Sequence, residues 1–144
     1  MNKSPIFHLA IPINNVEDAI EFYETGLGSK VGRKNSHAVI FNFYGHQVVA
    51  HVTKEKSIPA KSIYPRHFGL VFEEKSQWEN LLTQVKKQKL SFYQEPKIRF
   101  LGQLTEHHTF FLEDPFYNLL EFKFYTNFEA IFDGKNITQI GDNS

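Results

Sequence analysis

The sequence predicts an α+β fold in which one unit, a strand followed by a helix and three further strands (βαβββ), occurs twice in tandem. Two observations support this prediction. Each half of the chain opens with a short apolar run followed by a segment of helical periodicity, and the two openings align with His8 opposite His67. Near the end of each half, residues 44–52 align with residues 114–122 without a gap.

The second alignment carries a chemical signal, because it places His51 opposite Glu121. An unpaired carboxylate is costly to bury in an apolar strand. Imidazole and carboxylate groups are, however, ordinary ligands of divalent metal ions. The pattern therefore indicates a duplicated fold with a metal ion between its halves.

The first half begins with an apolar strand over residues 7–13. Asn14 and Asn15 follow as candidate helix caps, since an Asn side chain accepts a hydrogen bond from the first helical turn. Apolar residues then recur at helical spacing: Val16, Ala19, Ile20 and Tyr23. Gly26 is a stop signal, and strands are predicted over 38–43 and 47–53.

The second half repeats this order after a polar segment that contains three lysines and two prolines. Ser76 and Glu79 match a capping box, and the apolar residues after Ser76 recur at helical spacing. Strands are predicted over residues 67–72, 91–96, 98–101, 109–112 and 119–125, with a short helix around Phe128. The expected organisation is one domain, with module one over about 5–53, a linker over 54–65, module two over about 66–125 and a tail over 126–144.

Composition limits the classes of function. Sixteen basic and sixteen acidic residues give no net charge, so no steering field for nucleic acid or an anionic membrane is expected. The chain has no cysteine, which excludes disulfides and thiolate chemistry. It contains no apolar signal region and no long apolar span, so we expect a soluble cytoplasmic protein.

Several short motifs occur in a recognisable order and spacing: His8, the helix residues 19–23 with Leu27-Gly28, His67, and Asp114-Pro115 followed by Asn118 and Glu121. In this order they resemble the vicinal oxygen chelate superfamily of glyoxalase I, extradiol dioxygenases, fosfomycin-resistance transferases and bleomycin-resistance proteins. The resemblance extends to about Tyr125. The chain departs from the usual pattern at Phe116-Tyr117, where members of the superfamily carry a small or acidic residue and then glycine.

The resemblance implies two βαβββ modules whose curved sheets enclose a metal cleft, and it implies a homodimer. His8, His67 and Glu121 match the two histidines and one carboxylate of metal-binding members. His51 matches a fourth position, which glyoxalase I fills with a carboxylate and the dioxygenases leave without a ligand. Such a set suits Fe, Zn, Ni or Mn with open positions for substrate.

Further candidates lie beside this set. His51 is also a candidate acid or base. Of His107 and His108 only one can face the cleft, because neighbours on a strand point to opposite sides. His108, which shares the parity of Phe110, is the predicted catalytic residue of the two. Arg99 is a candidate contact for an anionic part of the substrate.

Three other polar residues are expected to serve the structure. His46 lies in a predicted turn and is interpreted as structural or exposed. Asp114 and Asn118 are interpreted as turn-forming residues that bond to their own backbone.

The expected function is that of a divalent-metal-dependent enzyme acting on a small substrate chelated through adjacent oxygens. A glyoxalase-type lyase or isomerase is favoured because the fourth position is filled. The alternatives are an extradiol-type ring-cleaving dioxygenase that uses Fe(II), and a resistance-type protein that binds a small molecule without catalysis. No nucleic-acid or membrane partner is expected.

Overall fold

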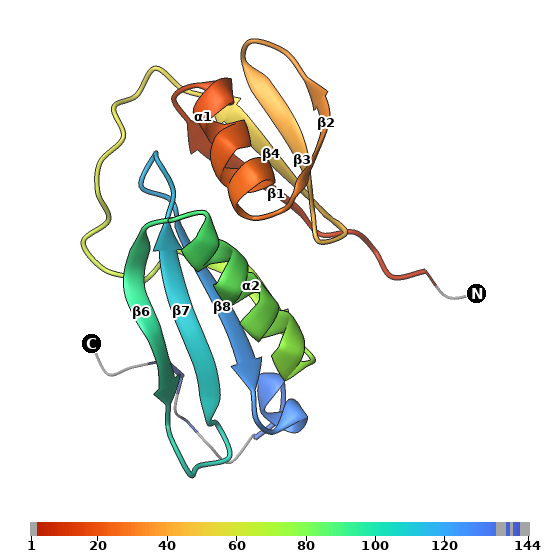
Figure 1. The fold of residues 1–144 in the computed structure, drawn as a ribbon, viewed down its shortest axis with the longest axis vertical. Coiled ribbons are helices and arrows are strands. Elements are labelled where there is room, and N and C mark those ends of the chain that lie inside the picture. Colours follow the sequence, from red (N-terminus) through yellow and green to blue (C-terminus); the bar gives the residue numbers. More distant parts are fainter. Residues whose placement is uncertain (1–2, 135–137, 139, 142–144) are drawn as a thin grey trace.

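The structure is a computed structural model that describes residues 3–134, 138 and 140–141. Two modules follow one another along the chain (Figure 1). Module one contains β1 (His8–Ile13), α1 (Val16–Ile20), the π-helical turn η1 (Glu21–Gly26), β2 (Lys30–Lys34), β3 (Ala38–Phe43) and β4 (His46–Val52). Module two contains β5 (Phe68–Phe72), α2 (Lys75–Lys87), β6 (Phe92–Arg99), β7 (His107–Glu113) and β8 (Leu119–Tyr125), followed by the 3₁₀ helix η2 (Phe128–Ile131).

Each module forms a four-stranded sheet with the same topology. The strand orders are β1-β4-β3-β2 and β5-β8-β7-β6. In both sheets the opening strand runs parallel to the last strand, and the remaining neighbours are antiparallel. This confirms the predicted α+β fold of two βαβββ modules.

Three local predictions differ from the structure. Strand β2 was not expected because Lys30–Lys34 is mostly polar, as is common for a sheet edge, where charged side chains oppose unwanted pairing. Strand β6 is one irregular strand rather than two short ones. Helix α2 begins earlier than the predicted cap at Ser76, because the Gln77 side chain accepts a hydrogen bond from the backbone N–H of Glu74.

Both sheets direct their helix-bearing faces into one shared core. In module one Tyr23 packs on Phe41, with ring centroids 5.2 Å apart. In module two Trp78 of α2 lies over the sheet and donates its indole N–H to Phe122 O at 2.9 Å. Phe43 packs against Phe122 across the two modules. The opposite face of each sheet is therefore free to carry polar residues.

A buried carboxylate joins the two modules. Asp114, at the turn between β7 and β8, accepts a 2.7 Å hydrogen bond from the phenol of Tyr23 in module one. It also accepts hydrogen bonds from the backbone N–H groups of Phe116 and Asn118, both at 2.8 Å. Burial raises the pKa of Asp114, and burial beside Asp114 raises the pKa of Tyr23 well above its usual value.

The turn after Asp114 keeps its geometry without glycine. Tyr117 adopts a left-handed backbone conformation with φ of 66°, which is uncommon for a residue with a side chain. Asn118 extends the link between modules, since its side-chain amide donates to Asp114 and to Pro12 O in β1. The predicted turn-forming role of Asp114 is confirmed, whereas the Asn118 side chain bonds to the Asp114 side chain and to β1 and not to its own backbone.

Among the described residues, no helix has the length and apolar character that crossing a lipid bilayer requires.

Tyr23→Phe should lower the free energy of unfolding by about 1–3 kcal/mol, because the buried Asp114 carboxylate loses a donor that no water replaces. Chemical denaturation followed by fluorescence measures the change. Tyr117→Phe, which removes the hydroxyl of a partly exposed tyrosine in the same turn, is the matched control and should change stability by less than about 0.5 kcal/mol. Equal stability of Tyr23→Phe and the native protein would contradict the proposed link.

Candidate functional site

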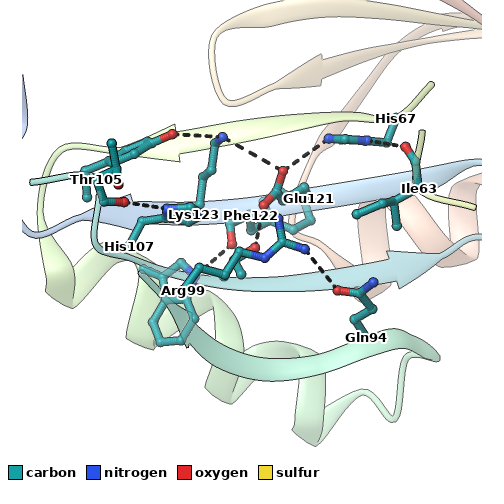
Figure 2. A network of polar contacts seen from close by, with 12 residues as sticks. Ile63, His67, Gln94, Arg99, Thr105, His107, Glu121, Phe122 and Lys123 are labelled. Atoms are coloured by element: carbon teal, nitrogen blue, oxygen red, sulfur yellow. Dashed lines mark hydrogen bonds and ion pairs between the residues drawn. The ribbon is translucent and has the colours of Figure 1, made fainter. Parts of the chain in front are cut away.

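His67 and Glu121 meet on the outward face of the second sheet (Figure 2). His67 immediately precedes β5, and Glu121 lies in the middle of β8, where it pairs with Gly69. A side chain at Gly69 would collide with the backbone of Glu121, so glycine allows the two strands to lie this close. Nε2 of His67 is 3.1 Å from Oε1 of Glu121.

Neighbouring groups fix the orientation of this pair. Nδ1 of His67 lies 2.7 Å from the carbonyl oxygen of Ile63. A carbonyl can only accept, so Nδ1 carries the hydrogen and Nε2 is the nitrogen directed at Glu121. The hydroxyl of Thr109 donates to the other Glu121 oxygen, Oε2, at 2.6 Å, and Lys123 Nζ is 3.9 Å from Oε1.

These contacts keep Glu121 ionised although it is only 7% exposed. Burial alone would raise its pKa. The hydrogen bond with His67, the charge of Lys123 and the hydrogen bond from Thr109 outweigh burial and lower the pKa of Glu121 to about 2. The same hydrogen bond with Glu121 raises the pKa of His67, against the opposing effect of burial.

The pair lies in a cavity of about 490 Å³ whose other walls come from β6, β7, β8 and the segment after β8. Arg99, at the end of β6, is 6% exposed and lines this cavity. Its guanidinium lies 5.6 Å above the Phe111 ring and donates to Gln94 Oε1 at 3.3 Å. Phe111 pairs with Glu121 across β7 and β8, so the guanidinium extends toward the carboxylate. Arg99 thus faces the cavity, and its role as a contact for substrate stays a prediction.

His107, and not His108, faces the cavity. Nδ1 of His107 lies 2.9 Å from the carbonyl of Thr105, and burial lowers the pKa of His107, so the ring is neutral near pH 7. His108 instead packs against Trp78 on the helix-bearing face, with ring centroids 5.4 Å apart. The prediction of His108 as the catalytic residue is therefore wrong. The sequence signal for His107 is its shared strand parity with Thr109, the residue that bonds Glu121.

His8 lies on the outward face of the other sheet. It is exposed, and its Nδ1 is 2.7 Å from the side-chain oxygen of Gln47, its neighbour in β4. Among the residues that the structure describes, no three His, Cys, Asp or Glu side chains come together as a metal site. A single chain thus brings His67 to Glu121 but does not add His8 or His51 to them.

The strand registers show that His51 is not the residue of module one that corresponds to Glu121 in module two. In module two the partner of Glu121 is Gly69, two residues beyond His67 and therefore about 7 Å along the strand. In module one the residue two positions beyond His8 is Ala10, and its partner in β4 is Val49. Val49, an apolar residue, thus occupies the position equivalent to Glu121.

His51 pairs with Pro12, four residues beyond His8, which is about 13 Å along the strand. The registers therefore contradict the alignment of His51 with Glu121, whereas a role of His51 as a metal ligand stays a prediction. A shift of two residues preserves strand alternation, so the gap-free sequence alignment could not detect it.

The remaining residues are His46, which was predicted to be structural or exposed, and cavity residues that were not predicted. His46 accepts the backbone N–H of Phe7 at 3.1 Å, which confirms its structural role. Lys123, Tyr64 and Tyr125 line the cavity and were not predicted. Alternation from Glu121 places Lys123 and Tyr125 on the same face, and this signal could have identified them.

Comparison with known proteins identifies a family and a similar solved structure. The family model described as Glyoxalase/Bleomycin resistance protein/Dioxygenase superfamily matches residues 6–122. A protein of that description from Alicyclobacillus acidocaldarius is 40% identical, with a TM-score of 0.85 over 91% of this chain and 98% of its own. No curated protein sequence matches significantly.

Two more distant structures share the fold. The fosfomycin resistance protein FosX of Listeria monocytogenes is 12% identical, with a TM-score of 0.68 over 90% of this chain and 99% of its own. Lactoylglutathione lyase of Agrobacterium tumefaciens is 18% identical, with a TM-score of 0.63 over 86% of this chain and 96% of its own.

The lowered pKa of Glu121 predicts a specific loss of stability in acid. The carboxylate stabilises the native state above its ordinary pKa of 4.5, and this contribution disappears as pH falls toward about 2. Glu121→Gln should therefore remove on the order of 3 kcal/mol of stability at pH 7 and progressively less between pH 4.5 and 2.

Urea unfolding of the metal-free protein across this pH range tests the prediction. Glu95→Gln, at an exposed position in β6, is the control and should follow the native curve. A constant difference between Glu121→Gln and the native protein at every pH would refute the prediction.

Proposed function

Because the chain belongs to the Glyoxalase/Bleomycin resistance protein/Dioxygenase superfamily, we propose that it is a divalent-metal-dependent enzyme. Its substrate would be a small oxygenated molecule chelated through adjacent oxygens. The observation that carries the proposal is the approach of His67 Nε2 to the ionised, largely buried Glu121 carboxylate inside an open cavity.

The donor set fits a divalent cation. With Nδ1–H directed at Ile63 O, neutral His67 presents a lone pair on Nε2 to a carboxylate oxygen 3.1 Å away. Two lone pairs at this distance repel unless a cation, either a proton or a metal ion, lies at the site. The side chains that bind a metal ion are typically also hydrogen-bonded to neighbouring protein groups, which fix their orientation. Here Ile63 O contacts the imidazole of His67, and the Thr109 hydroxyl donates to the carboxylate of Glu121. Fe, Zn, Ni and Mn suit such nitrogen and oxygen donors.

A second copy of the chain would supply the third ligand. Two protein ligands are few for a catalytic site, which usually has three. His8 lies exposed on the outward face of module one, and this face has the topology of the face that carries His67 and Glu121. We therefore propose a homodimer in which His8 of one copy completes the His67–Glu121 pair of the other.

Cavity side chains would perform the remaining chemistry. A bound divalent ion supplies Lewis-acid polarisation of substrate oxygens. His107, buried and neutral, would take or return the proton at Nε2, because its Nδ1–H is held by Thr105 O. Arg99 would orient an anionic group of the substrate. Proton transfer by His107 favours a lyase or isomerase. Both predicted roles of His51, as a metal ligand and as an acid or base, stay predictions.

One observation favours the alternative of an Fe(II)-dependent ring-cleaving dioxygenase. Val49 occupies the position equivalent to Glu121, so the proposed set is two histidines and one carboxylate with open positions. Non-haem Fe(II) oxygenases commonly use this combination. Assays with methylglyoxal–thiol adducts and with catechols under air separate the two reactions.

Metal binding by ligand variants tests the proposed centre. Glu121→Ala and His67→Ala should each lower bound metal, measured by elemental analysis after dialysis, at least tenfold, because each removes a ligand. His108→Ala, which changes a histidine on the opposite face, should retain native metal content. Equal metal content in all variants, or none in the native protein after metal loading, would rule out the proposed centre.

Mixing of variants tests the shared site. His8→Ala and Glu121→Ala should each fail to bind metal alone. In a refolded mixture each heterodimer should bind about half of the metal that a native dimer binds, because one of its two sites keeps all of its ligands. Absence of any recovery in a mixture that sedimentation shows to be dimeric would mean that the copies do not share ligands.

A further inference from the structure

Lys123 has two partners inside the cavity, one on each side of it along β8. Its Nζ is 3.9 Å from Oε1 of Glu121 (Figure 2). The same ammonium donates a hydrogen bond to the hydroxyl of Tyr125 at 3.1 Å and lies 5.2 Å from the centroid of the Tyr125 ring. Alternate residues of a strand share a face, so Glu121, Lys123 and Tyr125 form one row. The ammonium can therefore shift between a carboxylate and a phenol.

Glu121 needs a compensating charge when no metal ion is bound. It is buried, and an ionised carboxylate without a partner is costly to bury. Neutral His67 directs a lone pair at Oε1, because its single hydrogen is on Nδ1. Thr109 donates a hydrogen bond but carries no charge. The permanent charge of Lys123, beside Oε1, thus stabilises the ionised carboxylate.

The position of Lys123 conflicts with a metal ion at the proposed centre. Oε1, the oxygen beside Lys123, is also the oxygen that faces Nε2 of His67. A divalent ion held by these two atoms and the ammonium would be close neighbours of like charge, and such charges repel most where little water screens them. The Lys123 side chain is partly exposed and has a flexible stem, so it can leave Glu121 and keep Tyr125.

From this arrangement we propose that Lys123 is a tethered competitor of the metal ion. Its ammonium stays beside Glu121 while the centre is empty and withdraws toward Tyr125 when a divalent ion is bound. Lys123 thereby stabilises the metal-free protein and lowers its affinity for metal. It is a positioning residue, since it acts through the carboxylate of Glu121. The inference rests on the proposed function, because it requires a metal centre at His67 and Glu121.

Lys123→Met tests the proposal because it should produce two effects of opposite sign. In the chelator-treated protein it should lower the thermal midpoint of unfolding by about 3 °C, since Glu121 loses its cation. In calorimetric titration with Ni²⁺ it should tighten binding at least about fivefold, since the competing charge is gone. A merely structural role of Lys123 would predict weaker binding together with the lower midpoint. Lys123→Arg keeps the charge and should not tighten binding.

Lys87→Met, which removes an exposed lysine of α2, is the control for overall charge and should change neither quantity. If the native protein binds Ni²⁺ and Lys123→Met binds it equally or more weakly, the competitor role is overturned and the proposed metal centre stands. If neither protein binds Ni²⁺, the proposed centre itself is refuted, and the inference fails with it. The two failures are therefore distinguished by the native titration alone.

Discussion

The arrangement of the site depends on the hydrogen bonds that the buried carboxylate of Asp114 accepts. It accepts the phenol of Tyr23 from module one while it orders the turn that leads into β8. A carboxylate buried at this depth is stable only with several donors. The requirement therefore fixes the helix of one module against the turn of the other. Since Glu121 lies in the strand that follows this turn, its position on the sheet depends on the same contact.

The two modules share a topology but divide the chemistry unequally. Module two carries the His67–Glu121 pair, the neutral His107 and two cations on one sheet face. Module one carries His8, with Val49 at the place that corresponds to Glu121. Both sheets use their helix-bearing faces for the common core, so the polar faces point away from it. This division is the physical basis for proposing that two copies complement each other.

Much of the fold and part of the site could be predicted from sequence. Apolar periodicity located both helices, and strand β8 has the bounds expected for it. The choice between His107 and His108 failed because it depends on which face of β7 is packed by α2. The polar strand β2 was not predicted, because an edge strand has no strong apolar pattern. Tyr117 shows a further limit, since a left-handed backbone at a tyrosine is imposed by the surrounding turn.

The sequence by itself determined the duplicated topology and the turn residue Asp114, and its resemblance to the superfamily placed His67 and Glu121 in one predicted site. These features follow from local periodicity, from side-chain-to-backbone hydrogen bonding and from short motifs. Only the tertiary structure decided that Val49, and not His51, takes the position equivalent to Glu121 and that Lys123 lies beside Glu121. Strand register and packing face set these distances, and a shift of two residues changes the register without changing the alternation of the sequence.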